Sequence, residues 1–102
     1  MAAIWYAYQA FYDGVATPTQ LYYVGLADTT LGEVDKIRDM TDPANRWNLR
    51  VLAEKVYRSY MHDGSDDDLS EAITQAYMDD TVEKHNELLN IVENLVTPPD
   101  PE

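Results

Sequence analysis

Apolar residues between Asp42 and His62 recur at steps of three and four, which is the spacing that forms one face of an α-helix. Asp42 is a favourable N-cap, and Pro43 suits the first helical position because its missing N–H would have no helical partner there. Asp63 and Gly64 supply a stop signal. The apolar face comprises Leu49, Leu52, Val56 and Tyr60, flanked by Trp47, Val51 and Met61. The pattern predicts a long helix around which we expect the rest of the chain to pack.

The N-terminal part of the chain contains two aromatic-rich segments that we interpret as strands. Residues 4–12 form the first and residues 21–27 the second, with a turn region that contains Asp13, Gly14 and Pro18 between them. The spacing of the aromatic residues in the first segment would also suit a helix. Bulky apolar residues occupy both faces of each strand, so one face should pack on helices. The predicted fold class is α+β, with an N-terminal two-stranded antiparallel hairpin followed by three or four helices.

The remaining segments carry helix signals. Thr30 and Glu33 match a capping box, which predicts a short helix from residue 31 to about residue 40. The last helical region spans roughly residues 66–96, and its apolar stripe changes direction near residues 79–81. This region is therefore either one long helix with different neighbours along its length or two helices. Its second half has a heptad seam at positions 82, 85, 89, 92 and 96.

The composition indicates a folded chain. From 102 residues with 45% hydrophobic content we expect a single compact domain over residues 1–96 and a flexible, Pro-rich acidic tail over residues 97–102. No apolar run approaches the roughly 18 residues of a membrane span, and the N-terminus lacks the basic segment of a secretory signal. We therefore expect a cytoplasmic protein without membrane partners, in the host cytoplasm if a phage encodes it. The absence of cysteine excludes disulfides and zinc–thiolate sites.

The net charge of −12 is distributed unevenly along the chain. Residues 1–42 carry a net charge of −4, residues 43–62 carry +3, and residues 63–102 carry −11. The strongly acidic C-terminal part of the chain repels phosphate groups. We therefore expect no direct binding to nucleic acid. The same field attracts basic protein surfaces, including those that nucleic-acid-binding proteins present to their substrates.

Catalytic and metal-binding patterns do not rise above background. The three serines lie outside any nucleophile-elbow pattern, and the two histidines fall in different predicted helices. The strongest metal candidate is a cluster of His62, Asp63, Asp66, Asp67, Asp68 and Glu71. An EF-hand loop aligned on Asp63 has Asp68 where glycine is needed and Thr74 where glutamate is needed. Helix capping explains these acids, and we expect no enzyme activity, no cofactor and no metal.

The acids of the last helical region are the best candidates for a binding surface. On a continuous helix, the acids between residues 79 and 87 would share one side, opposite the apolar seam. With aromatic anchors from the hairpin, the candidate protein-binding residues are Asp66, Asp67, Asp68, Asp79, Asp80, Glu83, Glu87, Tyr6, Tyr8 and Tyr22. The alternative is a solvated face, or a halophile's surface, that serves only solubility. The hairpin aromatics could equally be buried by helices or by a second copy of the chain.

The basic residues of the predicted 42–62 helix also allow more than one interpretation. Arg50, Glu54 and Arg58 are spaced to form an ion-pair ladder at steps of four. Alternatively, the cations lie beside the acidic C-terminal region and offset its self-repulsion. We favour this arrangement over an independent phosphate-binding patch.

Together these patterns predict a small acidic protein-binding module. In its sharpest form the hypothesis is an inhibitor that presents a nucleic-acid-like anionic surface to a basic groove, of the anti-restriction or anti-CRISPR type made by phages. The expected partner is a basic surface, most simply that of a nucleic-acid-binding protein. The alternative is a structural or assembly component of a virus or a halophile, in which acidity serves solubility. A homodimer is compatible with both.

Overall fold

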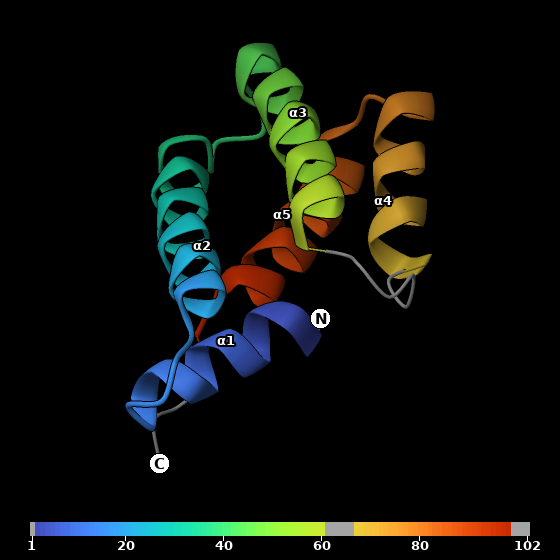
Figure 1. The fold of residues 1–102 in the computed structure, drawn as a ribbon. Coiled ribbons are helices and arrows are strands. Elements are labelled where there is room, and N and C mark those ends of the chain that lie inside the picture. The colour runs from blue at the N-terminus through green and yellow to red at the C-terminus, as the bar shows by residue number, and fades with distance from the viewer. Residues whose placement is uncertain (1, 61–66, 99–102) are drawn as a thin grey trace.

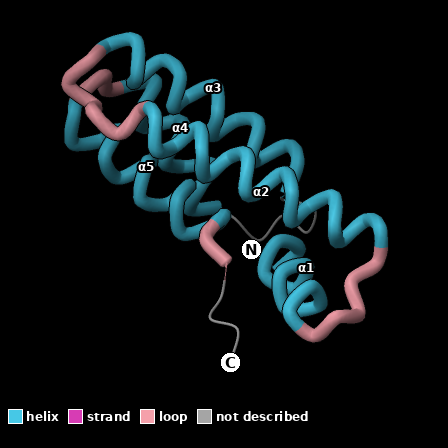
Figure 2. The backbone as a smooth tube through the Cα atoms, turned by 90° about the vertical axis from the view of Figure 1, so that its left-hand side faces the viewer, coloured by secondary structure: helices cyan, strands magenta, loops and turns pink. Residues whose placement is uncertain are grey.

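The computed structural model describes residues 2–60 and 67–98, and within these ranges the chain forms five α-helices and no strand. They are α1 (Ala2–Tyr12), α2 (Pro18–Lys36), α3 (Pro43–Tyr60), α4 (Asp67–Met78) and α5 (Val82–Val96). Helices α2 to α5 form a bundle, and α1 lies across one end of it, as Figures 1 and 2 show.

Helix α5 lies at the centre of the fold, because it contacts all four other helices. The face that it buries comprises His85, Leu88, Leu89, Val92, Leu95 and Val96. Most of the predicted seam is therefore buried, whereas Val82 at its start is exposed. Helix α3, which we expected to be the packing centre, contacts α2, α4 and α5.

The last helical region consists of two antiparallel helices, α4 and α5, joined by the loop of residues 79–81 (Figure 1). Thr81 is the N-cap of α5, and its side chain accepts a hydrogen bond from the backbone N–H of Lys84 at 3.2 Å. The change in direction of the apolar stripe near residue 80 thus marks a reversal of the chain.

The predicted N-terminal hairpin is wrong, and the α+β fold class with it, because both proposed strands lie in helices. Ile4, Ala7 and Tyr8 are buried together on one side of α1, at the three- and four-residue spacing of a helix. In a half-buried strand every second residue would be apolar and would point to the same face. Here the aromatic residues occur at both odd and even positions, so they would occupy both faces of a strand. Helical periodicity outweighs the strand propensity of the aromatic side chains in this segment.

Helix α2 begins at a cap that we had interpreted as part of a turn. Thr17 and Gln20 form a reciprocal capping box, with hydrogen bonds of 2.8 Å and 3.2 Å, and Pro18 occupies the first turn. The capping box predicted at Thr30 is wrong, because Thr30 lies inside α2 and its hydroxyl donates to the carbonyl of Leu26 at 2.9 Å. A single helix therefore replaces the second strand and most of the short helix predicted after it.

Helix α3 begins at the predicted cap. The side chain of Asp42 accepts a hydrogen bond from the backbone N–H of Ala44 at 2.9 Å, and Pro43 is the first helical residue. The apolar residues that α3 buries are Leu49, Leu52, Ala53 and Val56. The predicted end of the helix at His62 lies outside the described residues.

The described part of the chain ends at Pro98, so most of the predicted tail lies outside it. The hydroxyl of Thr97 donates to the carbonyl of Glu93 at 2.6 Å and closes the last turn of α5. Of the helices described, none combines the length and hydrophobicity that a membrane crossing requires.

Candidate functional site

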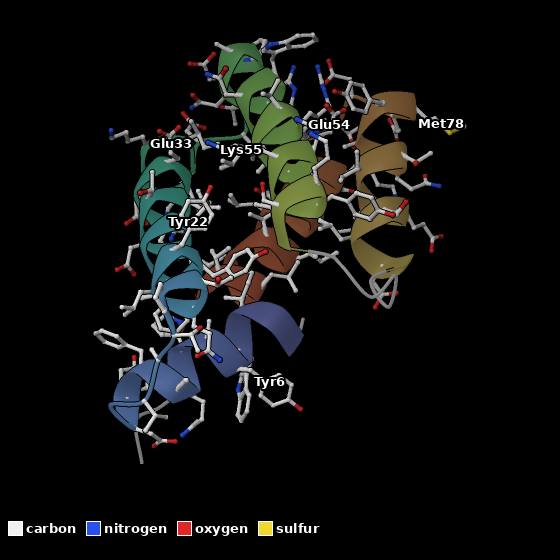
Figure 3. All side chains as sticks on the ribbon, viewed as in Figure 1. Tyr6, Tyr22, Glu33, Glu54, Lys55 and Met78 are labelled. Carbon is white, nitrogen blue, oxygen red and sulfur yellow. The ribbon has the colours of Figure 1, made fainter. Side chains whose placement is uncertain are left out.

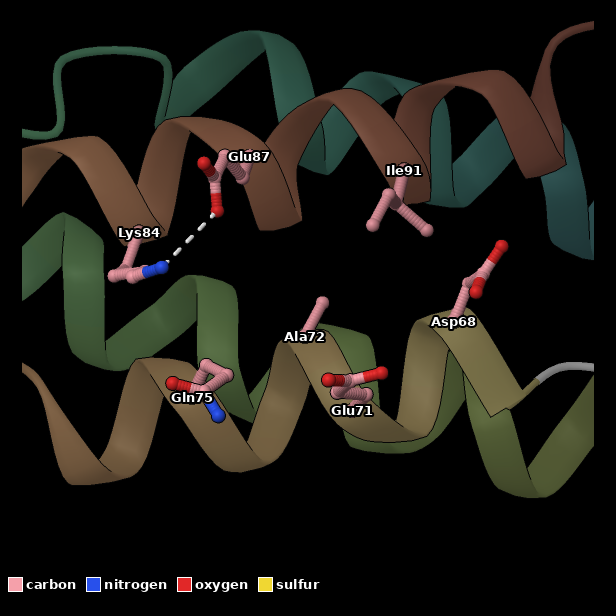
Figure 4. Close-up of a pocket in the computed structure, with 7 residues that line it drawn as sticks. All are labelled: Asp68, Glu71, Ala72, Gln75, Lys84, Glu87 and Ile91. Carbon is pink, nitrogen blue, oxygen red and sulfur yellow. Dashed lines mark ion pairs between the residues drawn. The ribbon is translucent and has the colours of Figure 1, made fainter.

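A groove between α4 and α5 brings together acidic side chains from both helices (Figure 4). Its volume is about 430 Å³. The residues that line it are Asp68, Glu71, Ala72 and Gln75 from α4 and Lys84, Glu87 and Ile91 from α5. On each helix these residues are three or four positions apart, so they share the face that borders the neighbouring helix.

The groove carries more negative than positive charge. Three carboxylates line it, and among its described residues the only base is Lys84, which lies 3.8 Å from Glu87. Among the residues that the structure describes, no base comes within ion-pair distance of Asp68 or Glu71. The alanine and the isoleucine of the groove supply apolar surface between the charges. This arrangement suits a Lys or Arg side chain, whose aliphatic stem can pack on the apolar surface while its charged end reaches a carboxylate.

The structure separates the acids that we expected to form one row. Asp79 and Asp80 lie in the loop between α4 and α5, so the row on a continuous helix does not form. Asp80 accepts hydrogen bonds from Nε of Arg46 at 2.8 Å and from Nη1 of Arg50 at 3.2 Å. The hydrogen bond from Arg46 is the main cause that lowers the pKa of Asp80 below its ordinary value. Asp80 therefore joins α3 to the α4–α5 loop.

The other predicted acids have three different environments. Asp68 and Glu87 line the groove, as described above. Glu83 is exposed in the first turn of α5, where the helix dipole favours negative charge, and Asp79 is exposed in the loop before it. Asp66 and the side chain of Asp67 lie outside the described residues.

Two of the four basic residues of α3, Arg46 and Arg50, hold α3 against the C-terminal segment. The guanidinium of Arg50 lies between the rings of Trp47 and Tyr77, at 5.4 Å and 5.0 Å from their centroids, and contacts the buried His85. A hydrogen bond to Glu54, together with desolvation, raises the pKa of Tyr77 above its ordinary value. The predicted ladder forms only between Arg58 and Glu54, at 4.0 Å, because Arg50 turns towards Asp80 instead.

The three tyrosines proposed as anchors have different environments. Tyr8 is only 3% exposed, and its hydroxyl donates a hydrogen bond of 2.7 Å to Asp28, so its side chain packs in the core. Tyr6 on α1 and Tyr22 on α2 are 60% and 65% exposed. In Figure 3, Tyr6 projects from α1 on the side away from α2. Of the three side chains, two are therefore accessible to a partner.

A second groove, between α2 and α3, is larger but less charged. Its volume is about 560 Å³, and its charged residues are Glu33, Lys36 and Lys55. Figure 3 shows Glu33 near the upper end of α2 and Lys55 partway down α3. Because bases outnumber acids here, this groove lacks the electrostatic selectivity of the α4–α5 groove for a basic partner.

Neither groove has the ligand set of a metal site. Within the described ranges, no group of three or more His, Asp or Glu side chains is arranged to hold a metal ion. Most of the acidic cluster considered above, from His62 to Asp67, lies outside those ranges or has no described side chain. Comparison with protein-family models, curated proteins and solved structures finds no match.

Part of the α4–α5 groove lies outside the binding residues predicted from the sequence. Glu71 belongs only to the predicted metal cluster, and Gln75, Lys84 and Ile91 have no predicted role at a site. The spacing of positions 68, 71, 72 and 75 and of positions 84, 87 and 91 contains the signal. This spacing predicts a groove only once the chain reversal at residues 79–81 is known, because the reversal turns this face of α4 towards this face of α5.

Proposed function

We propose that this protein is a non-catalytic binding module whose α4–α5 groove receives a basic segment of another protein. In its most specific form the proposal is an inhibitor that occupies the nucleic-acid-binding surface of its target. The observation that supports it best is the groove itself, where Asp68, Glu71 and Glu87 flank an apolar strip and Lys84 is the only base in the part of the groove that the structure describes.

The spacing and the charge of the groove carboxylates favour a partner with Lys or Arg side chains. Acidic residues three or four positions apart on one helix have Cβ atoms about 5–6 Å from each other, which lets a single cation or two neighbouring cations contact both carboxylates. Asp68 and Glu71 have no ion-pair partner among the described bases, so binding does not require an internal ion pair to break there. The net negative charge of the whole chain adds a long-range attraction that speeds association with a basic surface.

The competing proposal is a structural or assembly component whose acidity serves only solubility. It is favoured by the acids that stabilise the fold internally, since Asp80 binds Arg46 and Glu93 binds Arg38. The two proposals differ in what the groove carboxylates do. Under the structural proposal the carboxylates can be neutralised without any loss of binding.

A retention experiment with matched variants tests the inhibitor proposal. The immobilised chain is exposed to a cell extract freed of nucleic acid, and retained proteins are identified by mass spectrometry at salt concentrations from about 50 to about 500 mM. We expect retained basic proteins that double-stranded DNA displaces and that higher salt releases, because the contact is electrostatic.

The matched variants are Glu71→Gln with Glu87→Gln and, as a control, Glu33→Gln with Asp42→Asn. Both pairs remove two negative charges, and Asn remains a good N-cap at position 42. We expect the first pair to lose retention and the control to keep it. Retention that neither salt, DNA nor the groove variant affects would refute the inhibitor proposal.

A further inference from the structure

Helix α1 has an exposed side that takes no part in the acidic groove. None of its residues is charged, although the whole chain carries 19 acidic and seven basic residues. One side packs into the core through Ile4, Ala7 and Tyr8. A helix with so few polar residues is ordinarily buried on most of its sides, yet α1 packs mainly on α2 and makes a smaller contact with α5.

The uncovered part of α1 is aromatic. Trp5, Tyr6 and Tyr12 are 40%, 60% and 37% exposed, and Phe11 and Val15 add further exposed apolar surface at the end of the helix. Trp5 and Tyr6 form an edge-to-face pair with ring centroids 5.3 Å apart, and the ring of Tyr12 contacts that of Phe11 at 5.8 Å. Rigid aromatic side chains lose little conformational entropy on binding, so such a patch is suited to an interface.

We propose that α1 pairs with α1 of a second copy of this chain, in an antiparallel, twofold-symmetric homodimer. Two chains of net charge −12 repel one another over most of their surfaces. The uncharged α1 is the surface on which two copies can meet without bringing their own acids together. The charge distribution therefore favours a second copy as the occupant of this face.

The positions of the aromatic residues fit a twofold axis. Trp5 and Tyr12 are seven residues apart, so at about 100° per residue they point in nearly the same direction from α1. When two α1 helices run antiparallel about an axis between residues 8 and 9, Trp5 of each copy faces Tyr12 of the other. A twofold contact uses the same patch on both chains, so every contact is made twice.

The available area indicates a modest affinity. At their exposed fractions, large aromatic side chains offer about 100 Å² each, so the side of α1 that carries Trp5, Tyr6 and Tyr12 offers on the order of 300 Å² per chain. Phe11 is six residues from Trp5 and points about 120° away from it, so it lies outside this contact. The total of about 600 Å² is below the size of a standard specific interface, which matches a weak and transient dimer. We therefore expect a dissociation constant in the micromolar range and a dimer that tightens as salt screens the repulsion between the chains.

Sedimentation equilibrium of the full chain tests the proposal. Over about 1–300 µM protein we expect the mass to rise from 11.6 kDa towards twice that value, and to rise at lower concentration in high salt. Groove binding responds to salt in the opposite direction, so failure of the dimer and failure of the inhibitor proposal are distinguishable. A chain that stays at 11.6 kDa in about 0.5 M salt would overturn the dimer.

Charge variants test the antiparallel geometry. Trp5→Glu and Tyr12→Lys should each yield a monomer, because each places a charge in an apolar contact. Mixed together, the two variants should form a heterodimer in which the new Glu and Lys face each other. Met78→Glu, an exposed apolar position on α4, should dimerise like the original chain. Failure of the mixture to associate, or a monomer that binds phosphatidylcholine vesicles instead, would overturn the proposal.

Discussion

Nη1 of Arg50 lies 2.9 Å from Nε2 of His85, whose side chain has no exposed surface. A guanidinium can only donate hydrogen bonds, so Nε2 of the imidazole must accept. The proton of the ring is then on Nδ1, which donates to the carbonyl of Thr81 at 2.7 Å. This chain of contacts joins α3 to the first turn of α5 and determines the tautomer of the histidine.

Replacing His85 with leucine should destabilise the fold. The substitution removes the imidazole contacts with Nη1 of Arg50 and with the carbonyl of Thr81, which costs about 1–3 kcal/mol of the free energy of unfolding. Urea unfolding measures the change, and Leu88→Met at a neighbouring buried position should cost less than about 1.5 kcal/mol. A nitrogen NMR spectrum that shows the proton on Nε2 would contradict the contact.

The contact between Asp80 and Arg46 should make stability fall at acid pH. Because the folded state lowers the pKa of Asp80 below 3.8, the unfolded chain takes up a proton first as pH falls. The stabilisation is therefore complete above the unfolded pKa and is lost as pH drops through the folded pKa. Thermal unfolding from neutral pH to about pH 2 should show a smaller acid dependence in Asp80→Asn. An identical dependence in both proteins would contradict this role.

Thr81 should contribute measurably to the stability of α5. Its side chain accepts a hydrogen bond from the N–H of Lys84, which Thr81→Ala removes at a cost of about 1 kcal/mol. Thr81→Ser keeps the acceptor oxygen and should remain close to the original stability. Denaturant unfolding of the two variants measures the difference, and equal stability would show that the cap has no effect.

The hydroxyl of Tyr8 should stabilise the contact between α1 and α2. It donates a hydrogen bond of 2.7 Å to Asp28, so Tyr8→Phe should lower the free energy of unfolding by about 1 kcal/mol. Tyr22→Phe removes a hydroxyl from an exposed side chain and should change stability little. Faster amide hydrogen exchange in α1 of Tyr8→Phe would locate the effect, and equal losses in both variants would contradict it.

Several helices are readable from local chemistry. The cap formed by Asp42 and Pro43 and the spacing of Leu49 and Val56 predict the start and the buried face of α3, because capping and periodicity act within a few residues. The N-terminal segments were misread because aromatic side chains suit strands by propensity, whereas the buried spacing of Ile4 and Tyr8 is helical. The capping box at Thr17 was overlooked in favour of a weaker one at Thr30.

The candidate site, like the fold, is predictable from the sequence only in part. The sequence by itself determined that the C-terminal half is strongly acidic and that acids recur at helical spacing, because charge and periodicity are local properties. Only the tertiary structure decided which acids remain available. The chain reversal at residues 79–81 places Glu71 and Glu87 on the two sides of one groove, and Arg46 from α3 binds Asp80. Both depend on contacts between residues distant in sequence, which follow from how the helices pack and not from any single segment.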